Sequence, residues 1–67
     1  MFNESAFKSL LTVEWEVANS LDTPKAWSGI LDWLNGANAV LGACNRPDWE
    51  KDVKFLWHIA LERLSSH

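Results

Sequence analysis

Two short polar segments, each ending in proline, divide the 67-residue chain into three stretches of similar length: Asp22–Pro24 and Asn45–Pro47. Proline is tolerated in the first turn of a helix but not in its interior, so each segment ends one helix and begins the next. Within each stretch, apolar residues recur at three- and four-residue spacing, and nothing alternates with the period of a strand. The sequence therefore predicts three helices, over residues 3–21, 24–44 and 47–64.

Connections this short make consecutive helices antiparallel neighbours. A chain of this length also has no room for a second hydrophobic core. We therefore expect one all-α domain over residues 1–67, with its three helices in an up-down-up order. Such helices form either a small closed bundle or a flatter layer that is completed by dimerisation.

Residues that can accept a hydrogen bond from a free backbone amide stand where each expected helix begins. Such side chains are preferred at the residue before a helix, because their oxygen satisfies an amide of the first turn. Asn3 or Ser5 suits the first helix, and Thr23 suits the second. For the third helix, we expect Asn45 or Asp48 to serve as the cap.

Gly36 is the residue that argues against a continuous middle helix, since an interior glycine costs about 1 kcal/mol. The apolar stripe nevertheless keeps its phase across Gly36, within an arc of roughly 180° on a helical wheel. A break would shift that phase, so we predict one uninterrupted helix. Cys44 closes the stripe and is expected to be a small buried hydrophobe. The stripe consists of Trp27, Ile30, Leu31, Leu34, Ala37, Val40, Leu41 and Cys44.

The first helix carries apolar residues over an arc of roughly 200°, about twice what one buried face needs. The arc consists of Ala6, Phe7, Leu10, Leu11, Val13, Trp15, Val17, Ala18 and Leu21. Glu14 lies near its middle, where a carboxylate must be paired, protonated or turned towards solvent. It either reaches solvent at the edge of the bundle or meets a cation on a partner or a second copy. The helix therefore displays more apolar surface than two neighbours can cover.

Five tryptophans in a chain of this length are a second sign of surplus apolar surface. Tryptophan fills small cores efficiently, and it is also enriched among the anchors of protein interfaces. Trp27, Trp49 and Trp57 lie within their stripes, so we expect them in the core. Trp15 and Trp33 lie on the flanks of their stripes and are the better interface candidates.

The third helix has a small apolar patch outside its main stripe, formed by the i,i+4 pair Phe55 and Ile59. The main stripe consists of Trp49, Val53, Leu56, Trp57, Ala60, Leu61 and Leu64. We combine the extra pair with flank residues of the other helices into a predicted partner-binding set. That set is Leu11, Glu14, Trp15, Trp33, Phe55 and Ile59.

Several classes of function are disfavoured by composition and spacing. Six Lys and Arg against nine Asp and Glu give a net charge of −3, which disfavours binding to nucleic acid. The single cysteine excludes an internal disulfide framework. His58 and Glu62 share a helix face but supply only two of the three or four ligands that a metal needs. With no phosphate-binding glycine loop and no catalytic set, we expect no cofactor, no metal and no enzymatic activity.

The remaining hypothesis is a small, soluble, acidic helical protein that acts by binding another protein. It would work as a stoichiometric inhibitor, adaptor or accessory subunit, of the kind that a phage, plasmid or bacterium encodes. The alternative is a homodimeric structural module, and a metal- or ligand-binding bundle using Glu14, His58 and Glu62 ranks last. The sequence begins with no basic, apolar leader, and its longest apolar stretch contains Asp32, so we expect a cytoplasmic protein outside the membrane.

Overall fold

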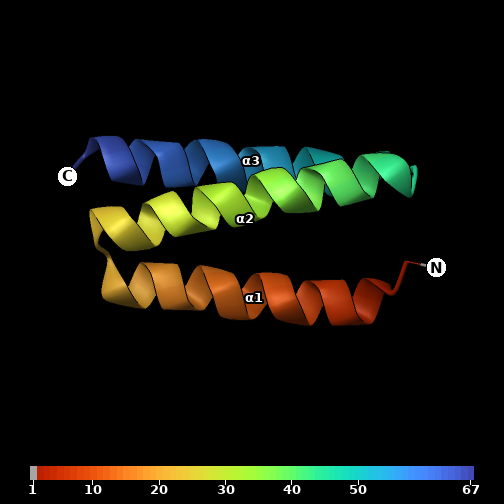
Figure 1. Cartoon of the computed structure of the whole chain (residues 1–67), viewed down its shortest axis with the longest axis horizontal. Coiled ribbons are helices and arrows are strands. Elements are labelled where there is room, and N and C mark those ends of the chain that lie inside the picture. The colour runs from red at the N-terminus through yellow and green to blue at the C-terminus, as the bar shows by residue number, and fades with distance from the viewer. Residues whose placement is uncertain (1) are drawn as a thin grey trace.

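The computed structural model describes residues 2–67 and consists of three α-helices. They are α1 (Glu4–Leu21), α2 (Pro24–Ala43) and α3 (Pro47–Ser65). Each bound lies within one residue of the sequence-based prediction. The helices run antiparallel, and α2 lies between α1 and α3 (Figure 1). The predicted all-α, up-down-up arrangement is therefore confirmed.

The first two helices begin as the capping rules predict. The Asn3 side chain accepts a hydrogen bond of 3.0 Å from the amide of Ala6. The Thr23 hydroxyl accepts one of 3.2 Å from the amide of Ala26, and proline follows it in the first turn of α2. These bonds satisfy amides that have no partner inside the helix, so they fix where each helix starts.

The third helix begins differently, and the expected caps Asn45 and Asp48 are wrong. Asn45 adopts a left-handed conformation with φ of 55°, and its amide donates to the carbonyl of Gly42 at 3.2 Å. The amide of Arg46 donates to the carbonyl of Leu41 at 3.0 Å, which completes a Schellman motif at the end of α2. Asp48 instead accepts a 3.0 Å hydrogen bond from the Arg46 guanidinium. Arg46 thus occupies the cap position of α3 without a side-chain cap.

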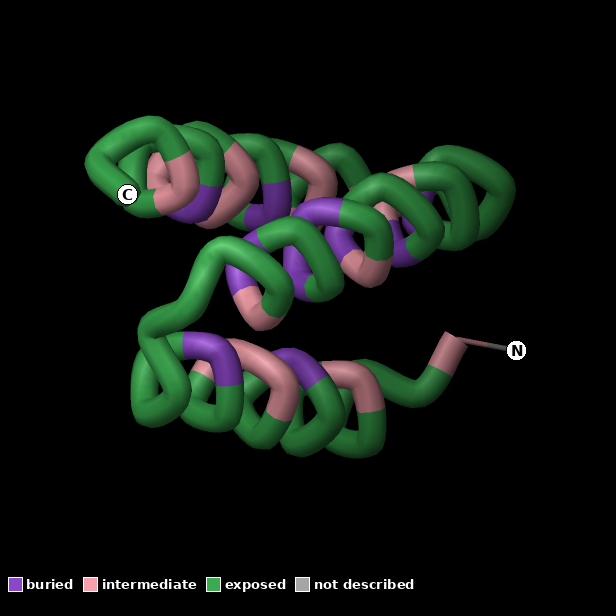
Figure 2. The backbone as a smooth tube through the Cα atoms, turned by 60° about the vertical axis from the view of Figure 1, so that its left-hand side comes forward, coloured by how far each residue is buried: buried purple, intermediate pink, exposed green. Residues whose placement is uncertain are grey.

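The hydrophobic core is built mainly by the central helix. α2 continues through Gly36 without a break, as the phase of its stripe predicts. Figure 2 shows the buried positions concentrated on α2 and on the sides of α1 and α3 that face it. The buried residues are Leu11 and Ala18 from α1, Trp27, Ile30, Leu31, Leu34, Ala37 and Leu41 from α2, and Val53 and Ala60 from α3.

α1 packs on α2 through one half of its apolar arc. The ring of Phe7 stacks on Trp33 of α2, with 6.1 Å between the ring centroids. About two turns further along α1, Trp15 meets Trp27 edge to face at 5.5 Å. Leu11 lies in the core cluster. The remaining half of the arc takes no part in this packing.

Between α1 and α3, the backbones stay apart, and no Cα of one described helix lies within 8 Å of the other. Side chains bridge the gap instead. Phe7 of α1 meets the indole of Trp49 edge to face, with 5.3 Å between the ring centroids. Arg63 donates to the Asn19 side chain at 3.4 Å, and the indole of Trp49 donates to the Glu4 carboxylate at 2.9 Å. Arg46 also pairs with Glu4 at 3.4 Å. α1 is therefore held by its packed side on α2 and, near its two ends, by side-chain contacts with α3 and Arg46.

Asp22 joins the end of α1 to the start of α2 and to the end of the chain. The backbone of Asp22 adopts the left-handed conformation, with φ of 47°. Its carboxylate accepts a 2.8 Å hydrogen bond from the indole of Trp27. The same oxygen lies 3.1 Å from Nε2 of His67. The Trp27 hydrogen bond, followed by the contact with His67, lowers the pKa of Asp22 below its ordinary value of 3.8.

This lowered pKa predicts a loss of stability in acid that depends on Asp22. Because the folded state favours the carboxylate, Asp22 contributes stability above pH 3.8, and the contribution disappears as the pH falls through the lowered value. We expect Asp22→Asn to lower the unfolding temperature at neutral pH and to match the wild type in strong acid. Thermal unfolding of both proteins across the acid range checks this, since every other carboxylate titrates in both. A difference that stays constant at all pH values would contradict it.

Candidate interaction surface

The outer face of α1 is a continuous apolar stripe that no other part of the described chain covers. It consists of Leu10, Val13, Val17 and Leu21, whose exposed fractions are 57, 56, 50 and 61%. Their spacing of three, four and four residues places them along one side of the helix. The surplus apolar surface that the sequence predicts is thus present in the single chain, as the half of the α1 arc that does not pack on α2.

A shallow hollow of about 470 Å³ runs along part of this outer face. Its lining combines the apolar side chains of Val13, Val17 and Leu21 with the polar side chains of Glu16 and Ser20. A hollow formed by one helix alone is open on its far side. It has the shape of a surface on which a second element can lie, and not that of an enclosed ligand site.

Acidic side chains flank the outer face on both sides. On the helical wheel, Glu14 lies about 60° from Val17 on one edge, and Glu16 lies about 60° from Val13 on the other. Glu14 is half-buried and forms no hydrogen bond or ion pair with any of residues 2–67. Lys8 is the only base on α1 and lies about 180° from Val17. The stripe is therefore bordered by negative charge without a compensating base on its own helix.

A second hollow of about 400 Å³ lies where α1 meets α2, lined in part by Phe7, Trp33 and Gly36. Val40, which is 55% exposed, and the carboxylate-bearing Asp32 also line it. A Cβ added at Gly36 would meet nothing within 4 Å, so glycine is not required there by close packing. This hollow adds apolar surface beside the first turns of α1.

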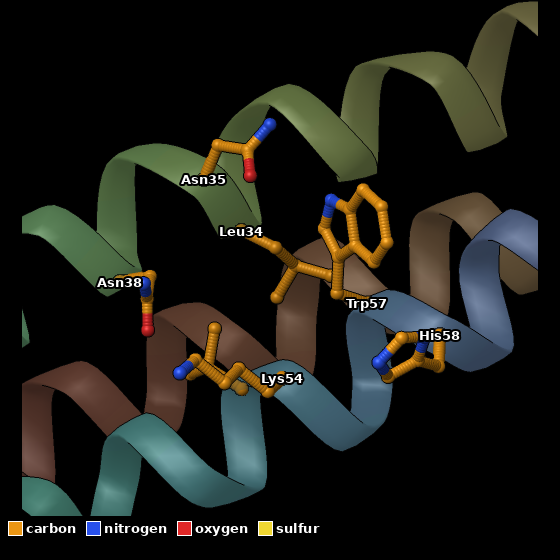
Figure 3. Close-up of a pocket in the computed structure, with 7 residues that line it drawn as sticks. Leu34, Asn35, Asn38, Lys54, Trp57 and His58 are labelled. Carbon is orange, nitrogen blue, oxygen red and sulfur yellow. The ribbon is translucent and has the colours of Figure 1, made fainter.

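The third hollow, of about 300 Å³, lies between α2 and α3 (Figure 3). Asn38 and Lys54 line it, together with Trp57 and His58, which meet edge to face at 5.4 Å. Oδ1 of Asn38 and Nε1 of Trp57 are buried without a hydrogen-bond partner among the described residues. Since both atoms are covered by neighbouring groups, a ligand in the hollow does not reach them directly.

The predicted partner-binding residues do not form one exposed surface. Leu11 lies in the core, only 8% exposed, which argues against its assignment to a partner contact. Trp15 and Trp33 are half-buried in ring contacts within the chain. Phe55, 66% exposed, and the half-buried Ile59 belong to α3, whose backbone does not approach α1. The binding role of these residues and of the half-buried Glu14 remains a prediction.

Of the three tryptophans expected in the core, Trp27 is the one that is fully buried. The other four, Trp15, Trp33, Trp49 and Trp57, are all half-buried and pack against the core. In a bundle this thin, an indole is too large to be covered completely anywhere but in the central helix.

Cys44 is exposed, so the expectation that it is buried is wrong. It is the residue that caps α2, where the chain already turns away from the core. The neighbouring side chains that bury Leu41, one turn earlier in the stripe, therefore do not reach Cys44.

Sequence reasoning did not single out the four residues of the outer face. They belonged to the predicted arc, but a helical wheel does not say which half of a wide arc meets the neighbour. The available signal was side-chain size: Phe7 and Trp15, the two aromatic residues of the arc, lie on the same half. The half with the larger rings offers more apolar area to bury, and it is the half that packs.

Among residues 2–67, no cluster of three or more His, Cys, Asp or Glu side chains is arranged to hold a metal ion. None of the three helices is both long enough and apolar enough to cross a bilayer. Comparison with known proteins found no family model, no curated protein and no solved structure that matches the chain.

Proposed function

We propose that this chain is a small acidic binding module that acts by docking the outer face of α1 onto another protein. The observation that carries the proposal is the uncovered stripe of Leu10, Val13, Val17 and Leu21. Contiguous apolar patches on small soluble proteins commonly mark interaction sites. The module would act stoichiometrically as an inhibitor, adaptor or accessory subunit, and no enzymatic step is proposed.

The fold is suited to this role because docking costs α1 none of its existing contacts. Phe7, Leu11 and Trp15 hold α1 on α2, while the stripe projects from the other side of the helix. Full burial of one aliphatic side chain contributes about 1.5–3 kcal/mol, so four together supply substantial driving force for association. Laying a helix face against an apolar surface is also a common mode of protein recognition.

We propose that the protein acts in the cytoplasm. The single exposed cysteine, Cys44, supports that setting, because a reducing compartment keeps an unpaired surface thiol free. A homodimeric structural module is the alternative, since the same stripe can also meet its equivalent on a second copy. The following experiment separates the two.

Site-specific photo-crosslinking tests the proposal in the cell that makes the protein. A photoreactive amino acid replaces Val17 on the outer face or, as the matched control, Lys8 on the opposite side of the same helix. We expect position 17 to give a discrete adduct whose mass differs from twice the mass of the chain. We expect no adduct from position 8. The proposal fails if position 17 gives no adduct or if both positions give the same one. An adduct of exactly two copies would establish the homodimer instead.

A further inference from the structure

We infer that the outer face of α1 binds a basic amphipathic helix of a partner protein, and not a second copy of this chain. The inference rests on the proposed function and adds the chemistry of the partner. Its basis is the position of the charges around the stripe of Leu10, Val13, Val17 and Leu21.

Both edges of the stripe are acidic. Glu16 lines the hollow together with Val13 and Val17, so it supplies a negative charge at the border of the apolar surface. Glu14 borders the other edge and has no ion-pair partner among residues 2–67. The acidic Asp32 lines the neighbouring hollow between α1 and α2. Beyond Leu21, Lys25 is the only base in the first turn of α2.

A second copy of α1 is a poor occupant of this face. In a parallel or an antiparallel pairing of two α1 stripes, an edge with a carboxylate lies against another edge with a carboxylate, because the charged side chain on each edge is acidic. Like charges at such flanking positions oppose helix pairing, and opposite charges there determine which partner binds and in which orientation. Lys8 cannot relieve this repulsion from the far side of the helix.

A complementary occupant follows from the same geometry. The stripe from Leu10 to Leu21 spans about three turns, or about 16 Å of helix. A partner helix of similar length with an apolar stripe fits this span, and Lys or Arg on both flanks of its stripe meet Glu14 and Glu16. Apolar burial then supplies most of the affinity, while the flanking charges supply specificity and faster association.

Two designed peptides test the charge preference on the full chain. Both are helical, about three to four turns long, with Leu at the stripe positions; one has Lys on both flanks and the other has Glu. Their affinities are measured by fluorescence anisotropy of a dye on the peptide. We expect the Lys peptide to bind at least about tenfold more tightly than the Glu peptide at about 50 mM salt, with the difference shrinking at about 500 mM.

A pair of charge-matched variants assigns the preference to this surface. Glu14→Gln with Glu16→Gln should remove most of the preference for the Lys peptide. Asp52→Asn with Glu62→Gln changes the net charge equally on exposed positions of α3 and should leave the preference intact. If both variant pairs reduce it equally, overall charge rather than this face is responsible, and the inference is overturned.

The remaining outcomes separate the inference from the function on which it rests. Equal binding of both peptides overturns the basic partner but leaves an apolar docking face in place. A sedimentation mass of two copies that Val17→Glu returns to one copy overturns the inference in favour of self-association. If neither peptide binds, the inference is again overturned, and crosslinking at position 17 decides independently whether a foreign partner uses the face.

Discussion

Replacing Trp27 with alanine is expected to remove at least about a third of the stability of the folded chain. The Trp27 side chain is fully buried, meets the edge of Trp15 and donates a 2.8 Å hydrogen bond to Asp22. Truncating a buried Trp costs about 3–5 kcal/mol, because apolar contacts are lost and a cavity remains. A domain of this length has a total stability of only about 3–10 kcal/mol. Urea unfolding followed by circular dichroism measures the loss.

Trp27→Phe is the matched control for this prediction. Phenylalanine keeps an aromatic ring in the core and loses the hydrogen bond to Asp22, so we expect a folded protein whose loss of stability is well below that of Trp27→Ala. Val40→Ala, at a 55% exposed position of the same helix, should change the unfolding free energy by no more than about 0.5 kcal/mol. If Trp27→Ala were as mild as Val40→Ala, the core described around α2 would be wrong.

The positions of the three helices could be predicted from the sequence because local chemistry determines them. Pro24 and Pro47 each stand in the first turn of a helix, and Thr23 caps the second helix as expected. Gly36 did not interrupt α2, since the buried residues on either side of it share one face. Signals of this kind depend on neighbours in the chain and do not require the tertiary arrangement.

Features that depend on a choice between competing partners could not be predicted in the same way. Asn45 can cap a following helix or end a preceding one, and the backbone bonds that end α2 were formed instead. Cys44 matched the phase of a buried stripe, but its exposure depends on how far the neighbouring helices cover α2. Phase alone does not contain that information.

For the candidate site, the sequence predicted that α1 exposes surplus apolar surface, but it did not predict which residues are exposed. The width of the α1 arc correctly indicated more apolar surface than the bundle covers. The sequence assigned Leu11 and Trp15 to a partner, whereas the most exposed apolar side chains of α1 lie on the other half of the arc. The wheel alone did not say which half α2 would cover. The packing of Phe7 on Trp33 shows which half of the arc faces α2. That contact could be predicted only from the position of α2 in the folded chain.

The most direct test of the central claim replaces the whole outer face of α1 and measures folding and binding on the same protein. Leu10, Val13, Val17 and Leu21 are all changed to Gln, which is at least as good a helix former as Val. Because these side chains are exposed, we expect a folded chain within about 1 kcal/mol of the wild type. The photoreactive amino acid now replaces Ser20, which lines the hollow beside the stripe and is not one of the four changed residues. We expect it to give a crosslinked adduct when the stripe is intact and none in the quadruple variant.

The control is the single change Leu11→Gln on the packed side of the same helix. It places an amide in the core and should cost about 2–5 kcal/mol, more than the four outer replacements together. The account predicts that the unfolding free energy of the quadruple variant, measured in urea, stays within about 1 kcal/mol of the wild type while binding is lost. A quadruple variant that unfolds, or that still forms the adduct, would contradict it.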